Sequence, residues 1–73
     1  MSSILTQAMI FEKYGPRLGI EQLAELMALS PKTIYNQVSA KKFPVPTYVD
    51  GGARWADYRD AAAHFDTLRA QAA

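Results

Sequence analysis

Leu29-Ser30-Pro31-Lys32-Thr33-Ile34-Tyr35 is the stretch that decides the fold, because it begins a helix directly after another helix has to end. Ser30 is a preferred N-cap residue, since its side-chain oxygen accepts a hydrogen bond from a backbone N–H that has no partner inside the helix. Pro31 follows at the first helical position, where no N–H is needed. The pattern predicts a helix over residues 30–39.

This predicted helix has an apolar face and a polar face. At about 100° per residue, Ile34 and Val38 face inward together, and Asn36 then points directly away from them. The residues beside Asn36 are Lys32, Thr33 and Ala40, with Tyr35 and Ser39 on one flank. The outward face is small, polar and partly basic, which is typical of a surface that meets a partner.

A second helix is predicted just before this one, from about Gly19 or Ile20 to Met27. Its apolar residues recur at i, i+3, i+4 and i+7, which gathers on one face Ile20, Leu23, Ala24 and Met27. Because Ala24 is small, the following helix can cross closely over this face, with Ala28-Leu29 as the link. Two short helices joined by a tight turn form a helix-turn-helix.

A β-hairpin is predicted after the two helices. Phe43-Pro44-Val45-Pro46 contains two prolines, which exclude a helix and a central strand. The β-prone residues Thr47-Tyr48-Val49 then precede a turn at Asp50-Gly51-Gly52, and Arg54-Trp55 begins the return strand. The hairpin would form a wing with Arg54 at its tip, packed on the helices because a lone hairpin is marginally stable.

Two further helices are predicted at the ends of the chain. The first runs from Ser3 to Tyr14, with Ser2 or Ser3 as its cap, and ends at Gly15-Pro16. Its apolar stripe consists of Ile4, Leu5, Ala8, Met9 and Phe11. Packing onto the core and contact with another molecule are both open roles for this stripe. Asp57 caps the last helix, which runs to about Ala70 and has an inward face of Tyr58, Ala61, Ala62, Phe65 and Leu68.

Length and composition exclude several classes of function. The 73 residues suffice for one domain, residues 1–73, which would bury only about 60% of the surface of its unfolded chain. Without Cys there is no disulfide, thiolate nucleophile or Cys-ligated zinc, and no paired carboxylates or phosphate-binding loop occur. We therefore expect no enzyme and no metal, cofactor or small-molecule site. Without a long apolar run or a secretory signal, we expect a cytoplasmic protein that does not enter a membrane.

Charge is distributed unevenly although the net charge is only +1. Residues 30–54 carry four Lys and Arg against one Asp, a net charge of +3. The rest of the chain carries four Lys and Arg against six Asp and Glu, a net charge of −2. This basic segment contains the helix predicted over residues 30–39 and most of the predicted hairpin.

The order of these features resembles a known family, the MerR-like winged helix, and most closely the small AlpA-type phage regulators and excisionases. The similar runs are Ile20 to Leu26, Leu29 to Tyr35, Phe43 to Pro46, Gly51 to Trp55 and Asp60 to Phe65. The similarity covers roughly residues 18–66, and the extra N-terminal helix resembles the layout of pyocin-activator-like proteins. Two departures stand out: Ala28 replaces the usual glycine of the turn, and Asn36 and Gln37 stand where arginine is frequent.

The resemblance implies a mainly α-helical winged helix-turn-helix with one small β-hairpin wing and an extra N-terminal helix. It also implies a DNA-binding protein of a phage or integrated element: an excisionase that binds and bends DNA cooperatively and also regulates transcription. The expected partners are double-stranded DNA, further copies of the chain and an integrase. A dedicated transcriptional regulator and a protein-interaction module, such as an antitoxin or adaptor, are the alternatives.

Nine residues are predicted to contact DNA. Lysine suits guanine and Asn or Gln suits adenine, so the candidates for base edges are Lys32, Thr33, Asn36 and Gln37. Lys41, Lys42 and Arg54 are predicted to hold the backbone and, through the wing, the minor groove. Ser30 and Tyr35 complete the set. Two roles are open for Tyr35: its hydroxyl contacts a phosphate, or its ring packs in the core. Trp55 is expected in the core.

Overall fold

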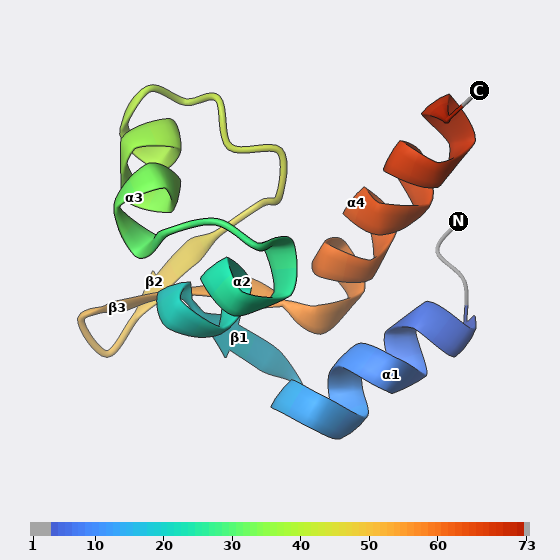
Figure 1. Ribbon diagram of the computed structural model, residues 1–73. Coiled ribbons are helices and arrows are strands. Elements are labelled where there is room, and N and C mark those ends of the chain that lie inside the picture. The colour runs from blue at the N-terminus through green and yellow to red at the C-terminus, as the bar shows by residue number, and fades with distance from the viewer. Residues whose placement is uncertain (1–3, 73) are drawn as a thin grey trace.

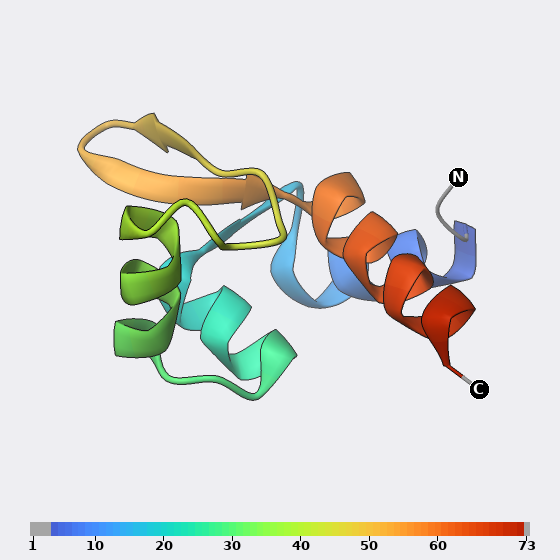
Figure 2. The ribbon, with the colours of Figure 1, turned by 90° about the horizontal axis from the view of Figure 1, so that it is seen from above.

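Four helices and a three-stranded antiparallel sheet make up the computed structural model, which describes residues 4–72. In chain order the elements are α1 (Ile4–Tyr14), β1 (Arg17–Gly19), α2 (Ile20–Met27), α3 (Pro31–Ser39), β2 (Tyr48–Asp50), β3 (Ala53–Asp57) and α4 (Tyr58–Gln71). The fold is mainly helical. Figures 1 and 2 show α3 and the β2–β3 hairpin at one end of the molecule and the pair α1 and α4 at the other end.

The predicted helix boundaries are confirmed by their caps. The Ser30 hydroxyl accepts a hydrogen bond from the Thr33 N–H at 3.1 Å, and the Asp57 carboxylate accepts one from the Arg59 N–H at 2.7 Å. Gly15 has φ +87°, the left-handed conformation that ends α1 before Pro16. The predicted caps of α1, Ser2 and Ser3, lie outside the described residues. None of the described helices is long and apolar enough to cross a membrane.

The sheet contains one more strand than the sequence predicts. The β2–β3 hairpin is confirmed, but β3 also pairs with β1 on its other side. Leu18 of β1 lies opposite Ala56, and both are fully buried. β1 has only three residues between Pro16 and the start of α2, which is too short for an alternating pattern to be visible.

The core lies where α2, α3, α4 and the sheet meet. Its buried residues are Ile10, Leu18, Ile20, Leu23, Ala24, Ile34, Val45, Ala56, Ala61 and Ala62. The predicted inward faces of α2 and α3 are confirmed, because Leu23, Ala24 and Ile34 are buried and Val38 packs against them. Val45 inserts between two exposed prolines and anchors the segment that leads from α3 to the hairpin.

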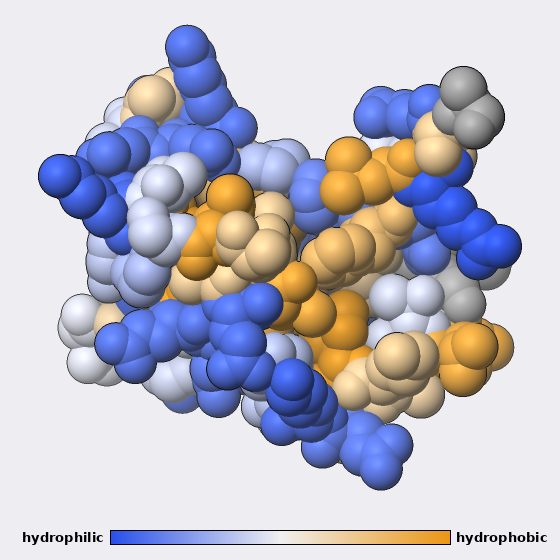
Figure 3. All heavy atoms as spheres, viewed as in Figure 1, coloured by the Kyte–Doolittle hydropathy of each residue, from blue (hydrophilic) through white to orange (hydrophobic). Residues whose placement is uncertain are grey.

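Most of the apolar stripe predicted for α1 is exposed; Phe11 is the exception in part, because its ring contacts that of Tyr58 edge to face at 5.0 Å between the ring centres. Ile4, Leu5 and Met9 are 83%, 70% and 63% exposed, and Ile10 is the residue of α1 that the core buries. Leu68 in the predicted inward face of α4 is also exposed, because the last turns of α4 extend past the core (Figure 1). Hydrophobic residues gather over α1 and α4, whereas hydrophilic ones prevail over α3 (Figure 3).

The turn between α2 and α3 is tight although it lacks a glycine. Ala28 adopts φ 57° and ψ 40°, the left-handed conformation that glycine adopts without strain. The Leu29 N–H then donates to the Ala24 carbonyl at 2.9 Å and closes the end of α2. The alanine therefore leaves the geometry of the turn intact, at an energetic cost of about 1 kcal/mol.

Candidate nucleic-acid interface

The outward face of α3 is exposed as the sequence predicts. Lys32, Tyr35 and Asn36 are exposed, whereas Thr33 and Gln37 are half-buried. Asn36 lies opposite the buried Ile34, so its amide is free to donate and accept hydrogen bonds outside the protein. A helix with a short, polar exposed face has the dimensions that the major groove of B-DNA admits.

Ser30 and Thr33 already use their hydroxyl groups within the protein. The two oxygens are 2.8 Å apart, and Ser30 also accepts the Thr33 N–H. These contacts hold the first turn of α3 in place. The two hydroxyl groups therefore have a structural role. A DNA group that binds either hydroxyl must share or replace the hydrogen bond between them.

Lys41 and Lys42 lie in an unusual turn immediately after α3. Lys41 has φ 57°, a conformation that few residues other than glycine adopt. The turn is fixed by two backbone hydrogen bonds, from the Lys41 N–H to the Val38 carbonyl at 3.0 Å and from the Lys42 N–H to the Gln37 carbonyl at 2.8 Å. Both side chains are exposed, so two positive charges stand at the end of α3.

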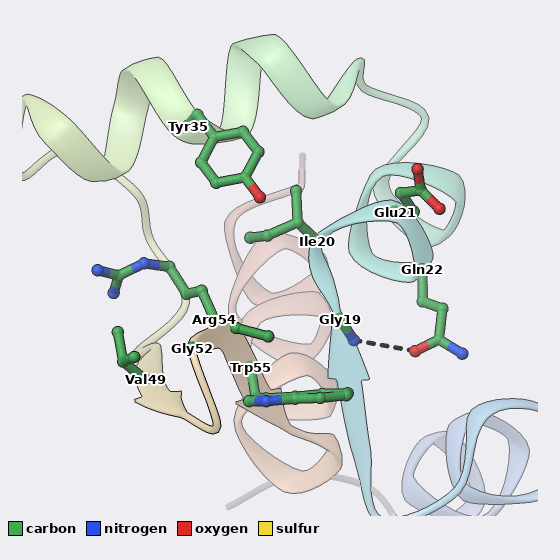
Figure 4. Close-up of a pocket in the computed structure, with 10 residues that line it drawn as sticks. Gly19, Ile20, Glu21, Gln22, Tyr35, Val49, Gly52, Arg54 and Trp55 are labelled. Carbon is green, nitrogen blue, oxygen red and sulfur yellow. Dashed lines mark hydrogen bonds between the residues drawn. The ribbon is translucent and has the colours of Figure 1, made fainter.

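Arg54 does not lie at the tip of the hairpin, which corrects the sequence prediction. The tip is Gly51-Gly52, with φ 62° and 81°, and Arg54 is the second residue of β3. Its guanidinium donates a hydrogen bond to the Thr47 hydroxyl at 2.9 Å. The Arg54 side chain points from the sheet toward α3, into the same space that the Tyr35 side chain enters from α3 (Figure 4).

The space between α3 and the hairpin is an open groove of about 680 Å³. The residues that carry polar side chains into it include Tyr35 from α3 and Arg54 from β3 (Figure 4). Gly19 and Gln22 line the far end, where the Gly19 N–H donates to the Gln22 side chain at 2.9 Å. The groove therefore places a hydroxyl and a guanidinium opposite each other, both of which can donate to an anionic oxygen.

The positive charges divide into paired and unpaired groups. Three form ion pairs: Lys13 with Glu25 at 3.0 Å, Arg17 with Asp50 at 2.7 Å and Arg59 with Asp57 at 3.0 Å. The hydrogen bond from Lys13 lowers the pKa of Glu25, and that from Arg59 lowers the pKa of Asp57.

Four of the predicted contact residues carry a positive charge, and all four fall in the unpaired group. The other unpaired cation among the described residues is Arg69, in the last turn of α4. Within residues 4–72, no carboxylate lies within ion-pair distance of Lys32, Lys41, Lys42 or Arg54. The three lysines are also exposed. Their ammonium groups are therefore available to an external anion.

The outer face of the sheet carries a contact that sequence reasoning missed. Trp55, expected in the core, is only half-buried there, and the Arg17 guanidinium lies 3.8 Å from its ring centre. Arg17 gave no signal in the sequence because β1 was not visible. Without a predicted strand around it, an arginine cannot be read as the partner of a Trp that is 38 positions away in the chain.

Across the described part of the chain, no cluster of three or more His, Asp or Glu residues is arranged to hold a metal ion. Comparisons of the chain with models of known families, with curated proteins and with solved structures found no match. The function is therefore inferred from the exposed side chains themselves. Lys32, Lys41, Lys42 and Arg54 belong to α3, the turn after it and the β2–β3 hairpin, and these elements lie at the same end of the molecule (Figures 1 and 2).

Proposed function

We propose that this chain is a winged helix-turn-helix protein that binds duplex DNA at specific sequences. The observation that carries the proposal is the group of unpaired, exposed lysines, Lys32, Lys41 and Lys42, around the free polar face of α3. The order of α2, a tight turn, α3 and the β2–β3 hairpin supports the same function, because this arrangement presents one helix and one wing to a duplex.

In the proposed complex α3 enters the major groove. Asn36 reads adenine through its amide, because the amide NH2 group can donate a hydrogen bond to N7 while the amide oxygen accepts one from the N6 amino group. Lys32 and Gln37 are the remaining candidates for base edges, and Thr33 contributes its methyl group to a thymine methyl. Asn36 and Lys32 are exposed, whereas Thr33 and Gln37 are half-buried.

The phosphate backbone is held on both sides of α3. Lys41 and Lys42 extend from the end of the helix, and Arg54 and the Tyr35 hydroxyl face the groove next to the hairpin. The hairpin tip, Gly51-Gly52, has no side chains and can approach the minor groove closely. These contacts set the register of α3 on the duplex, whereas the base contacts give the sequence preference.

For the biological role we propose an excisionase of a phage or integrated element that assembles cooperatively on DNA, bends it and acts with an integrase. One copy offers few cationic contacts, which gives weak and salt-sensitive binding. The exposed Ile4, Leu5 and Met9 of α1 support contact between neighbouring copies, since such residues are free of the core. A dedicated transcriptional regulator uses the same interface and remains the alternative role.

The exposed apolar residues of α1 also favour a second candidate function, a protein-interaction module such as an antitoxin or adaptor. The two functions differ in their dependence on salt. Binding through phosphates weakens steeply as salt rises, whereas an apolar helix contact does not.

Selection from a random duplex library tests the proposed function. The wild-type chain should enrich a short common motif, and tandem motifs should be bound with a Hill slope above one. The matched control is a library competed with excess unrelated duplex. Enrichment of no motif, with affinity equal to that for unrelated DNA, would contradict sequence-specific binding.

A further inference from the structure

The β2 strand is weakly attached to the rest of the protein. All three of its residues, Tyr48, Val49 and Asp50, are exposed, so no burial of β2 holds the hairpin in position. Its backbone pairs only with β3. β3 is held by its pairing with β1, so the position of β2 depends on its pairing with β3 and on side-chain contacts across the sheet.

Arg17 supplies such a contact and spans the whole sheet. Its side chain starts on β1, passes over the Trp55 ring of β3 with 3.8 Å between the guanidinium carbon and the ring centre, and ends on Asp50 of β2 at 2.7 Å. The Trp55 indole N–H donates to the Asp50 carbonyl at 3.1 Å. Three strands are thus joined through Arg17, Trp55 and Asp50, which we call the strap.

The register of the sheet makes room for the strap. Gly19 lies opposite Trp55, and a Cβ at Gly19 would be 3.7 Å from the indole ring, so the ring lies close to the glycine. Side chains that lie opposite in antiparallel strands share a face. Arg17, Trp55 and Asp50 therefore all lie on the outer face, while Arg54 lies on the opposite face toward α3.

We infer that Arg17 is a positioning residue, which fixes the hairpin relative to α3 so that both meet the duplex at once. This inference rests on the proposed DNA binding. Arg17 acts through Trp55 and Asp50 and makes no phosphate contact of its own, because its charge is already paired. Hydrogen bonds with Asp50 and then Tyr48 raise the pKa of Arg17 above its ordinary value, so its guanidinium keeps its positive charge.

The carboxylate of Asp50 gives the sharpest test. Loss of an acidic group near DNA normally raises affinity, because repulsion of the phosphates is removed. If Asp50 holds Arg17, the variant Asp50→Ala also releases the hairpin, and its affinity does not rise. In an Arg17→Ala background the strap is already broken, so the same Asp50→Ala change raises the affinity.

The experiment measures duplex affinity at several salt concentrations for wild type, Arg17→Ala, Asp50→Ala and the double variant. Arg17→Ala should weaken binding by about fivefold through the added cost of ordering the hairpin, with an unchanged salt slope. Arg59→Ala is the matched control, because it also removes one positive charge and one surface ion pair, that with Asp57, but not from the hairpin. Its affinity should change less than twofold.

A readout without DNA tests the strap separately. Arg17→Ala should speed amide hydrogen exchange in residues 48–55 but not in α2, and should expose Trp55, the only Trp, to fluorescence quenching. Arg17→Lys keeps the charge but loses the planar stacking, and should show the same changes if Arg17→Ala fails to fold.

Three results would overturn the inference. A salt slope that falls by about 0.9 in Arg17→Ala would make Arg17 a phosphate contact. Two results would show that the strap does not hold the hairpin. One is an equal gain in duplex affinity from Asp50→Ala in the wild-type and Arg17→Ala backgrounds; the other is unchanged amide hydrogen exchange of residues 48–55 in Arg17→Ala. Absence of duplex binding by the wild type, with the exchange result as expected, would defeat the proposed function and leave only the structural role of the strap.

Discussion

The two ends of the molecule differ in how they treat charge and apolar surface. At the α3 end, Lys32, Lys41 and Lys42 are exposed without carboxylate partners, and the groove next to the hairpin has a mixed lining in which polar side chains lie beside apolar ones. At the α1–α4 end, the groove of about 460 Å³ between α1, α2 and α4 is lined mainly by apolar residues, and Lys13 and Glu25 at its rim pair with each other. One small fold thus separates a surface suited to an anion from a surface suited to apolar contact.

The difference between the two ends shows that the net charge of the chain does not describe how its charges are distributed over the surface. A net charge of +1 does not point to nucleic-acid binding, yet Lys32, Lys41, Lys42 and Arg54 at one end are unpaired, whereas three of the four positive side chains elsewhere, all except Arg69, form ion pairs among the described residues. Exposed ion pairs contribute little to stability. Their absence around α3 is therefore more informative than their presence elsewhere.

The largest expected effect concerns the residue that joins α3 to the core. Ile34 is fully buried, and Ile34→Ala should lower the free energy of unfolding by about 3 kcal/mol through lost burial and the cavity left behind. Met9→Ala, at the exposed face of α1, should change it by less than about 0.5 kcal/mol. Urea denaturation measures both. An equal loss of stability in the two variants would contradict this comparison, because it would mean that Met9 is as deeply buried as Ile34.

The next effect concerns base recognition by α3. Asn36→Ala should cost about 1–3 kcal/mol of binding to the preferred site and leave binding to unrelated DNA unchanged. Gln71→Ala, an exposed amide at the end of α4, is the matched control and should change neither. Competition gel shifts give both affinities. Full discrimination by Asn36→Ala would show that another face of the protein reads the sequence.

A smaller effect is expected at the N-cap of α4, between the two ends. Asp57→Ala removes the hydrogen bonds to the Arg59 N–H and guanidinium and should destabilise the protein by about 1 kcal/mol at pH 7. Because Arg59 lowers the pKa of Asp57 below its ordinary value of 3.8, this stability is present above about pH 4 and is lost as pH falls through the lowered pKa.

Thermal unfolding between pH 2 and 7 measures this contribution. The difference between wild type and Asp57→Ala should shrink toward low pH. A difference that stays constant over the whole range would mean that the carboxylate contributes no charge-dependent stability.

The smallest effect is expected at the turn between α2 and α3. Ala28→Gly should stabilise the protein by about 0.5–1 kcal/mol, because glycine adopts the left-handed conformation at φ 57° without the strain of a Cβ. Ala40→Gly, at a helix end with φ −81°, is the matched control and should not stabilise. Chemical denaturation measures the free energy of unfolding of both variants. A loss of stability in Ala28→Gly would contradict strain at this turn.

Local signals account for the parts of the fold that the sequence predicts. Ser30-Pro31 and Asp57 mark helix starts through hydrogen bonds to neighbouring residues, and the spacing of Leu23 and Ile34 marks buried faces. Such signals depend on residues a few positions apart. The nine predicted DNA contacts rest on the same local pattern around α3, and they remain predictions.

The missed features depend on distant pairing. β1 forms only because Leu18 meets Ala56 across the sheet, and Arg17 acquires its role from Trp55 and Asp50, which are more than 30 positions away. The register of β3 also turns Arg54 toward α3 and away from the tip. No short-range pattern carries this information.

The most direct test of the central claim compares two triple variants that each remove three positive charges. One changes Lys32, Lys41 and Lys42 to Ala at the α3 end; the other changes Lys13, Arg59 and Arg69 to Ala elsewhere. Titration of a labelled duplex from low to physiological salt should show that the first loses most of its binding and that its salt slope falls by up to about 2.7, since each lost phosphate contact contributes about 0.9. The second should bind within about twofold of wild type, because its charges lie outside the proposed interface. Equal loss in both variants would contradict the account, since net charge alone, and not the unpaired lysines around α3, would then explain the binding.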